Sequence, residues 1–597
     1  MRSIFYSLAC GVLVGTSAAL QTTTKVCPVL GQVYPVPSGL SSNEKFQAAT
    51  KLFDAALNTT LETGISTDGA GPFNATTLSI GMFSASEKGL IYQRHYTDPS
   101  VRNSKFGTQN ADADSIYRLG SISKLLTVYL FLIREGDSRF NDPVTKYIPE
   151  LAAAASSPPS PNGITPNWNE ITIGQLASHM SGIATDYGTS ELSYPGVTPP
   201  GLPPIPENQA VNCNFVLPDG SFKPCTPEGE YYCIHERGYT DRMIEYLAGV
   251  VMEPALFHSG YTPSYSNNGF ELLGLVLENI TNSDLGKLFT ESIVETHCLT
   301  HTSLEPPSTL QNAVIPENTT ISGWNANLGV LNATGGYFSS TNDMATLGKA
   351  MLNGTILSKA QTRRWMKPVT FTANPNQGTG APWEIFRTQV NGRVIDMYTK
   401  NGGFGDYATI LVLVPDFDFG FSILTASTRG EAATSPLVYL ISEMIASTVL
   451  PALDQVAKDQ AEAAFAGHYA ASSLNSSLTI TADDQPGLRV TNWVSNGTEF
   501  FQDIGLGNNL GTYVDFRLQP NQLYTEDQVG FTGVGQTMPT PIYTGPFDVN
   551  CFTWGSVDRI TYGNVGIEEF VFEIDPTTGK ATNVQPKALR IKLEKQA

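Results

Sequence analysis

The chain has 597 residues, of which 55 are Asp or Glu and 35 are Lys or Arg, so its formal net charge at pH 7 is −20. This acidity argues against nucleic acid and anionic membrane surfaces as partners. The length, together with a 41% content of hydrophobic residues, predicts two domains or one large domain with an appendage.

The N-terminus has the pattern of a secretory signal peptide. Met1-Arg2-Ser3 carries a positive charge, residues 4–14 are apolar, and residues 15–19 are mostly small. We therefore expect cleavage after Ala19 and a secreted, extracellular protein. We expect no other segment to cross a bilayer, because a spanning helix needs about 20 largely apolar residues.

Cysteines and acceptor sites for glycans agree with this location. Removal of residues 1–19 leaves an even number of cysteines, which predicts disulfide bonds of open connectivity among Cys27, Cys213, Cys225, Cys233, Cys298 and Cys551. Zinc is the alternative, but no Cys-x-x-Cys or His-Glu-x-x-His spacing supports it, so we expect no metal and no organic cofactor. Asn-x-Ser/Thr sites predict N-glycosylation at Asn58, Asn74, Asn279, Asn318, Asn332, Asn353, Asn475 and Asn496.

In chain order, the first predicted elements are a helix and a strand pair. The helix covers residues 41–62, and Ser41 with Glu44 has the spacing of a capping box. Alternating residues at 77–83 and 89–94, separated by a polar turn, predict two paired strands.

The next helix carries the first candidate for chemistry. Arg118-Leu119-Gly120-Ser121-Ile122-Ser123-Lys124 leads into an almost wholly apolar run that ends near Gly136, which predicts a buried helix. Residues at i and i+3 share a helix face, so Lys124 is expected beside the Ser121 hydroxyl. This is the arrangement of a nucleophile with an adjacent base. A structural N-cap is the other reading, and Ser42 with Lys45 repeats the same spacing in the first predicted helix.

The middle of the chain combines a short helix with a long irregular segment. Residues 171–182 predict a helix that ends at Gly182, in which His179 is more typical of a hydrogen-bonded helix end than of a catalytic group. Residues 187–232 are rich in Pro, Gly, Asn and Ser, and a long irregular segment of this kind inside a compact domain is either functional or disordered. Its cysteines suggest that it is ordered. We expect Cys213, Cys225 and the adjacent Cys233 to form one local disulfide and one longer one, which would hold the segment over the active site.

Further elements follow in two groups. Residues 270–277 predict a buried helix, residues 407–415 and 419–425 predict a hairpin in a central antiparallel sheet, and residues 436–450 predict a helix with Pro436 in its first turn. A short helix at 452–465 is expected next. Period-two alternation then predicts a small antiparallel β domain at the C-terminus.

Three motifs stand in order along this chain: Ser121-Ile122-Ser123-Lys124, Tyr265-Ser266-Asn267 and Lys400-Asn401-Gly402. The set resembles the penicillin-binding-protein and class C β-lactamase superfamily of serine hydrolases over residues 40–450. The resemblance implies an α+β fold for residues 20–450, in which helices flank a central antiparallel sheet and form a helical subdomain. Residues 451–597 would be an all-β accessory domain.

The resemblance also implies roles for individual residues. Ser121 would become acylated, Lys124 and Tyr265 would share its proton, and Asn267 would hydrogen-bond both Lys124 and the substrate. Lys400 would lower the pKa of Tyr265. The oxyanion hole would be formed by the backbone N–H groups of Ser121 and Gly403, and the glycines Gly402 and Gly403 would let substrate approach closely.

We therefore expect a secreted hydrolase that acts on a small ester, amide or lactam through a Ser121 acyl-enzyme. Asn401 stands where the superfamily usually has threonine, which makes recognition of a β-lactam carboxylate doubtful. An acyltransferase of secondary metabolism on the same fold and a catalytically silent binding protein are the alternatives. The sequence leaves the oligomeric state open.

Overall fold

The computed structural model describes residues 26–65, 71–157, 164–187, 201–203, 239–326, 328–503, 513–537 and 551–596. The expected signal peptide, most of the segment 187–232, and Cys213, Cys225 and Cys233 lie outside these residues. The chain divides into two compact units. The larger takes Leu30–Ala466 with Ile574–Ala581, and the smaller takes Gly467–Glu573 and Thr582–Ala597 with the N-terminal segment that ends at Val29.

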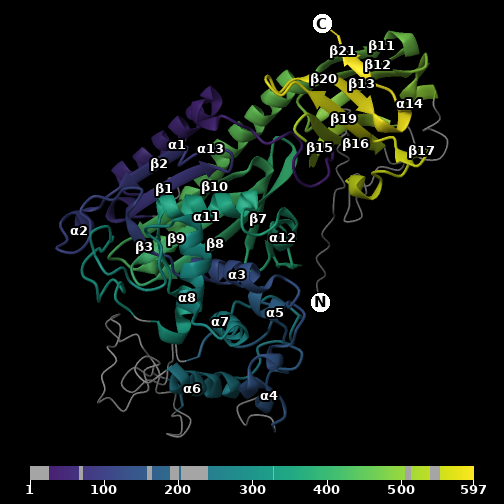
Figure 1. Cartoon of the computed structure of the whole chain (residues 1–597). Coiled ribbons are helices and arrows are strands. Elements are labelled where there is room, and N and C mark those ends of the chain that lie inside the picture. Colours follow the sequence, from purple (N-terminus) through teal and green to yellow (C-terminus); the bar gives the residue numbers. More distant parts are fainter. Residues whose placement is uncertain are drawn as a thin grey trace, which may run out of the picture. The chain divides into compact units, whose positions relative to one another are not determined.

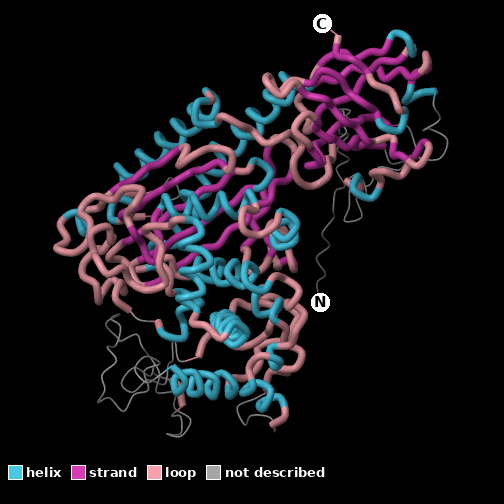
Figure 2. The backbone as a smooth tube through the Cα atoms, in the orientation of Figure 1, coloured by secondary structure: helices cyan, strands magenta, loops and turns pink. Residues whose placement is uncertain are grey.

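A large antiparallel sheet forms the centre of the larger unit (Figures 1 and 2). Among the described residues it has eight strands in the order β2-β1-β10-β9-β8-β7-β6-β5, and all neighbours are antiparallel. The strands are β1 (Thr77–Ser84), β2 (Tyr92–Tyr96), β5 (Thr370–Phe371), β6 (Gln377–Thr379), β7 (Glu384–Val390), β8 (Arg393–Phe404), β9 (Tyr407–Val414) and β10 (Phe419–Ala426). The predicted pairing of β1 with β2 and the β9–β10 hairpin are confirmed.

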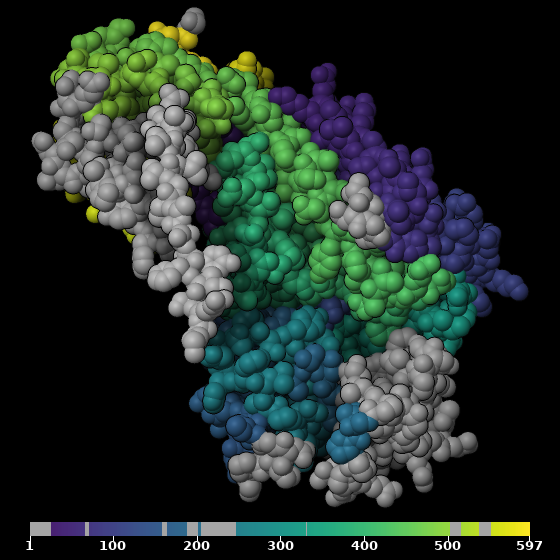
Figure 3. Space-filling view, turned by 180° about the vertical axis from the view of Figure 1, so that it is seen from behind, coloured from purple at the N-terminus to yellow at the C-terminus, as the bar shows by residue number. Residues whose placement is uncertain are grey.

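The strands β1, β9 and β10 are buried along their whole length because helices cover both faces of the sheet. Successive side chains of β9 point to opposite faces of the sheet. Ile410 and Val412 pack in the cluster that contains α1 (Glu44–Thr63) and α13 (Glu431–Phe465), whereas Leu411 and Leu413 pack in the cluster on the other face. In Figure 3 the purple α1 and the green α13 lie side by side on the outside.

The remaining helices surround the opposite face and form a helical region beside it. They are α2 (Pro99–Arg102), α3 (Ile122–Glu135), α4 (Pro149–Ala155), α5 (Ile173–Ala177), α6 (Tyr239–Met252), α7 (Asn267–Thr281), α8 (Leu285–Phe289), α9 (Glu295–His297), α10 (Asn332–Gly335), α11 (Thr341–Asn353) and α12 (Lys359–Trp365). Two short strands, β3 (Ile116–Arg118) and β4 (Phe338–Ser340), pair beside them.

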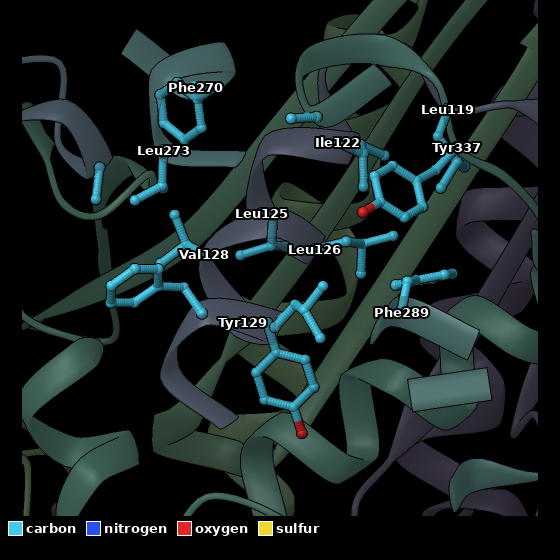
Figure 4. Close-up of a cluster of buried hydrophobic side chains, with 14 of the residues drawn as sticks. Leu119, Ile122, Leu125, Leu126, Val128, Tyr129, Phe270, Leu273, Phe289 and Tyr337 are labelled. Carbon is cyan, nitrogen blue, oxygen red and sulfur yellow. The ribbon is translucent and has the colours of Figure 1, made fainter. Parts of the chain in front are cut away.

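The predicted helix at 122–135 is the centre of the core. Every side chain from Ile122 to Leu132 is buried, as its apolar sequence predicts. Figure 4 shows that its residues meet α7 on one side and the segment before β4 on the other, through Leu125, Leu126, Val128, Phe270, Leu273 and Tyr337.

Three helix predictions are corrected. The first helix begins at Glu44, and its N-cap is Asn43, whose side chain accepts from the N–H groups of Lys45 and Phe46. The predicted Ser41 capping box is absent from this described segment because the Ser41 hydroxyl donates to Glu87 instead. The helix predicted at 171–182 is only Ile173–Ala177, since His179 adopts a left-handed backbone conformation with φ 60°.

The third correction joins two predicted helices into one. Residues 436–450 and 452–465 belong to the continuous α13, with Pro436 and Pro451 inside it. Val449, Leu450 and Leu453 pack into the sheet cluster on both sides of Pro451, so tertiary burial outweighs a proline cost of about 3 kcal/mol. By length and composition α13 could span a bilayer, contrary to our expectation for this part of the chain, but one side of it is a core surface.

The smaller unit is the predicted all-β domain. Its described strands form a sheet in the order β12-β11-β21-β20-β19-β16-β15-β13-β14, and because β12 also pairs with β13 the sheet curls back on itself. The longer strands are β11 (Gly467–Ala471), β12 (Ser476–Thr481), β13 (Leu488–Ser495), β15 (Tyr513–Tyr524), β16 (Gln528–Thr537), β19 (Glu569–Ile574) and β20 (Ala581–Pro586). The short elements are β14 (Thr498–Glu499), α14 (Phe500–Asp503), β17 (Thr561–Tyr562), β18 (Val565–Gly566) and β21 (Leu593–Lys595).

A disulfide joins Cys27 to Cys551 and ties the N-terminal segment to this unit. Cys298, in the larger unit, is exposed and is the one free cysteine among the described residues.

A buried arginine fastens α13 to the sheet. The Arg393 side chain is 2% exposed and donates to Asp454 of α13 at 3.0 Å and to Asp416 at 2.5 Å. We expect Arg393→Met to lower the free energy of unfolding by about 3–5 kcal/mol, because two carboxylates lose a buried partner. Urea denaturation followed by tryptophan fluorescence measures this.

The matched control is Lys45→Met, which removes the exposed pair between α1 and Asp459 of the same α13. Exposed pairs contribute about 0–1 kcal/mol, so the control should stay near wild type. Equal effects of the two substitutions would contradict the role given to Arg393.

Candidate active site

The turn that carries Ser121 is pressed against β8. Gly120 has φ 53°, and a Cβ there would lie 2.6 Å from the backbone nitrogen of Gly403. A Cβ on Gly402 would lie 1.9 Å from the Leu119 carbonyl and 2.8 Å from the Ser121 nitrogen. Only glycine permits this approach. The backbone N–H groups of Ser121 and Gly403 therefore belong to two segments in direct contact.

Two side chains converge on the Ser121 hydroxyl. The Lys124 ammonium donates to Ser121 Oγ at 2.9 Å, and the Tyr265 hydroxyl donates to the same oxygen at 2.8 Å. The helix α3 places Lys124 one turn after Ser121, while Tyr265 lies in the loop before α7. The Lys124 ammonium also donates to the Thr334 carbonyl at 3.1 Å and is fully buried. The structure thus brings three sequence-predicted residues together.

A fourth, Lys400, faces Tyr265 from the sheet. Its ammonium lies 5.4 Å from the centre of the Tyr265 ring, and that of Lys124 lies 5.0 Å away. Lys400 is fully buried and donates to Glu384 Oε1 of β7 at 2.5 Å and to the Asn401 carbonyl at 2.9 Å. The other Glu384 oxygen accepts from the Asn401 backbone N–H at 3.0 Å. One carboxylate thereby holds the start of the Lys400-Asn401-Gly402 motif.

These charges set the protonation of the site. Burial opposes the phenolate of Tyr265, but the charges of Lys124 and Lys400 outweigh it and lower the pKa of Tyr265. Burial, aided by the charge of Lys400, lowers the pKa of Lys124. For Lys400, burial is outweighed by the carboxylate of Glu384, so its pKa is raised. Both groups that contact the Ser121 hydroxyl are therefore shifted toward their deprotonated forms, and Lys400 toward its charged form.

Asn267 is placed differently from the expectation. It opens α7, its backbone N–H donates to the Thr185 carbonyl at 2.7 Å, and its side-chain Nδ2 donates to Asp186 at 2.7 Å. The expected hydrogen bond from Lys124 is replaced by those to Ser121 and Thr334. The Asn267 Oδ1 atom is buried without a hydrogen-bond partner in the described part of the chain.

Sequence reasoning did not foresee the position of His179. Its ring stacks on Tyr265 with centroids 4.4 Å apart, and its Nδ1 accepts from the Ser266 N–H at 3.1 Å. Burial lowers the pKa of His179 well below its ordinary value, with further lowering by Lys400 and Lys124, so the imidazole is neutral. His179 holds the ring of Tyr265 in position. The left-handed backbone conformation of His179 directs its ring toward Tyr265, and this conformation cannot be predicted from a helical sequence pattern.

A buried carboxyl group, Glu271, was also missed. It lies on α7 with 2% of its surface exposed, and neither carboxyl oxygen has a hydrogen-bond partner among the described residues. Burial raises the pKa of Glu271 well above its ordinary value, an effect that Thr334 and Lys124 only partly offset. One sign of this buried carboxyl group was visible in the sequence, because Glu271 is a charged residue inside an otherwise apolar helix. Among the described residues, no group of three or more His, Cys, Asp or Glu side chains could hold a metal ion.

Comparisons with known proteins identify both units. Residues 91–441 match the family model "Beta-lactamase", and residues 457–597 match "Beta-lactamase-like-like, C-terminal domain". Two similar relatives are the "Beta-lactamase-like protein" of Arthroderma benhamiae, 26% identical over 96% of both chains, and "Probable hydrolase M10" of a Phoma species, 25% identical over 98% of this chain and 94% of that one. A class C β-lactamase structure from Rhodobacter sphaeroides is 17% identical, with a TM-score of 0.43, over 67% of this chain and 99% of that one.

The raised pKa of Glu271 predicts a specific effect of pH on stability. The folded protein retains a proton that the unfolded chain releases above pH 4.5, the ordinary pKa of a glutamic acid. The contribution of Glu271 to the free energy of unfolding is therefore fully present below pH 4.5. It decreases as the pH rises toward the pKa of Glu271 in the folded protein, by up to about 1.4 kcal/mol per pH unit. Glu271→Gln keeps the shape and removes the titration. Its thermal midpoint relative to wild type should rise with pH.

Glu443→Gln, at an exposed position of α13, serves as the control and should show a constant difference. Other carboxyl groups with raised pKa values, such as those of Glu278 and Asp406, are present in both proteins, so their effects cancel in the difference between the two thermal midpoints. A constant difference for Glu271→Gln as well would mean that Glu271 is ionised in the fold.

Proposed function

The chain belongs to the β-lactamase family of serine hydrolases, and from this premise we propose that it cleaves a small ester, amide or lactam through a Ser121 acyl-enzyme. The observation that carries the proposal is the Ser121 hydroxyl held between the Lys124 ammonium at 2.9 Å and the Tyr265 hydroxyl at 2.8 Å. A nucleophile within hydrogen-bond reach of its base is the arrangement that covalent catalysis requires. The name "Probable hydrolase M10" of a full-length relative agrees with hydrolysis.

Acylation begins when Ser121 Oγ attacks the substrate carbonyl. Its proton passes to the Tyr265 phenolate, which the charges of Lys124 and Lys400 stabilise. A bond forms between Oγ and the carbonyl carbon, and the carbonyl oxygen becomes an oxyanion. The backbone N–H groups of Ser121 and Gly403 stabilise that charge.

Collapse of this intermediate breaks the bond to the leaving group. Tyr265 returns the proton to the departing oxygen or nitrogen, which leaves an ester on Ser121. Water then attacks the ester carbonyl and gives one proton to the Tyr265 phenolate. The bond between the acyl carbon and Ser121 Oγ breaks, and Tyr265 returns that proton to Oγ as the acid leaves. Lys124 is fully buried, and its ammonium donates to Ser121 Oγ. Its lowered pKa allows it to take part in the same proton transfers.

We also propose that the protein is secreted and N-glycosylated. The signal-like N-terminus supports this, as does the Cys27–Cys551 disulfide, since such bonds persist in oxidising compartments. Five acceptor asparagines are exposed: Asn74, Asn279, Asn353, Asn475 and Asn496. The other three are half-buried: Asn58, Asn318 and Asn332.

The mechanism predicts which substitutions stop the reaction. Ser121→Ala should abolish both turnover of an aryl ester and covalent labelling by a fluorophosphonate probe. Lys124→Ala should cost nearly as much, because residues that act as a unit are not additive. Tyr265→Phe keeps the stacked ring but removes the proton path, so a loss of about a hundredfold or more is expected. Steady-state kinetics and mass spectrometry of the labelled peptide measure these effects.

The control is Ser42→Ala, at the second Ser-x-x-Lys spacing of the chain. Among the described residues, the Ser42 hydroxyl donates to the Gly39 carbonyl just before α1 and contacts no residue of the candidate site, so labelling and turnover should persist. Labelling that survives in Ser121→Ala would refute the assignment of the nucleophile.

The location predicts the mass of the product. Expression in a secreting eukaryotic host should yield protein in the medium that lacks residues 1–19, carries glycans removable by an amidase, and shows the Cys27–Cys551 peptide under non-reducing conditions. Intact-mass analysis and peptide mapping test this. A reduced, unglycosylated chain that begins at Met1 and stays in the cytosol would disprove it.

A further inference from the structure

The strand β8 has an open edge beside Ser121. Its pairing with β7 begins at Thr399, opposite Glu384, whereas its pairing with β9 continues to Phe404. Residues 400–403 therefore have no strand paired with them on that side among the described residues. In the proposed acylation, a substrate whose carbonyl oxygen lies between the amides of Ser121 and Gly403 would lie beside this edge.

Glu431 of α13 packs against Gly403, on this same edge of β8. A Cβ on Gly403 would be 2.2 Å from Glu431 Cγ and 2.4 Å from Glu431 Oε1, so the carboxylate rests against this glycine. Two hydrogen bonds fix the position of Glu431. Its backbone N–H donates to the Gly405 carbonyl at 2.8 Å, and the Ser435 hydroxyl donates to its Oε1 at 3.0 Å.

The charge of Glu431 is not neutralised by a side chain. Glu384, the other carboxylate of this edge, is paired with Lys400. In the part of the chain that the structure describes, no lysine, arginine or histidine forms an ion pair with Glu431. The half-buried Glu431 thus presents a negative charge beside the oxyanion position.

An aromatic ring continues this surface. Glu431, Ser435 and Tyr439 occupy positions i, i+4 and i+8 of α13 and follow one face of the helix. Tyr439 is 37% exposed, and its hydroxyl contacts the side chain of Asn401. A carboxylate next to an accessible aromatic ring attracts an ammonium group and disfavours a carboxylate.

We propose that Glu431 is a specificity-determining residue, which selects substrates with a cationic or uncharged group beyond Gly403 and rejects those with a carboxylate there. This inference rests on the proposed serine hydrolase function of the same site. It concerns substrate choice, whereas Ser121, Lys124 and Tyr265 carry out the bond cleavage. Glu431 also lies in the first turn of α13, where a negative charge stabilises a helix. That structural role alone would leave substrate choice unchanged.

The test uses three aryl acetates that differ only in charge: 3-(trimethylammonio)phenyl acetate, phenyl acetate and 3-carboxyphenyl acetate. Each kcat/KM is divided by the rate of hydroxide hydrolysis of the same ester, which removes differences in intrinsic reactivity. Wild type should prefer the ammonium ester to the carboxylate ester by about tenfold or more, and Glu431→Gln should reduce this ratio by about tenfold. Glu443→Gln removes the same charge from an exposed position of α13 and should keep the wild-type ratio.

The outcomes separate the two proposals. A ratio that is the same in wild type and Glu431→Gln, with Ser121 labelling intact in both, overturns the role of Glu431 and leaves the proposed function standing. Absence of labelling and turnover in wild type overturns both proposals. If Glu431→Gln does not fold, the test uses the wild-type protein alone. The ratio of its kcat/KM values for the ammonium and carboxylate esters should decrease when salt is added, because screening weakens the attraction. A wild-type preference for the carboxylate ester overturns the inference.

Discussion

Two buried lysine ammonium groups, those of Lys124 and Lys400, lie 5.0 and 5.4 Å from the centre of the Tyr265 ring, and neither lysine has any exposed surface. Removing an ammonium group from water costs several kcal/mol unless other groups replace the lost hydration. The Lys400 ammonium donates to the Glu384 carboxylate and to a carbonyl, whereas the Lys124 ammonium donates to the Ser121 hydroxyl and the Thr334 carbonyl, which are both uncharged. Tyr265 is the ionisable group closest to both, and their positive charges lower its pKa. The same charges that favour its phenolate are the ones that the proposed proton transfer uses.

The surrounding architecture serves this arrangement by fixing three separate segments to one another. The apolar helix α3 anchors Ser121 and Lys124 in the core, and the close approach of Gly402 to the Leu119 carbonyl joins that helix to β8. His179 supports the outer segment, because its neutral ring lies flat against Tyr265. These contacts involve backbone or a rigid ring, so the proposed nucleophile and its proposed base are held in place before substrate binds.

The outer helix layer adds a second level of control. The helix α13 is fixed to the sheet by apolar packing and by Arg393, and it begins at Glu431 beside the open edge of β8. The proposed catalytic residues Ser121 and Lys124 thus come from the inner helix α3, while Glu431 comes from the helix on the opposite face of the sheet. Such a division allows substrate preference to change without disturbance of the nucleophile.

Local sequence patterns were sufficient for much of this structure. The apolar run after Ser121 predicts its buried helix, residues 407–425 predict the central hairpin, alternation predicts the C-terminal β domain, and the three ordered motifs indicate the family and name Ser121, Lys124, Tyr265 and Lys400. These features depend on residues within one or two turns, or on short motifs whose order is visible in the chain. The continuity of α13 through Pro451, the left-handed His179, the buried Glu271, and the positions of Glu384 and Glu431 depended on tertiary contacts. The physical reason is that burial and charge pairing are decided by neighbours in space, which for these residues lie many tens to hundreds of positions away or on another layer of the fold, and no spacing in the sequence records that proximity.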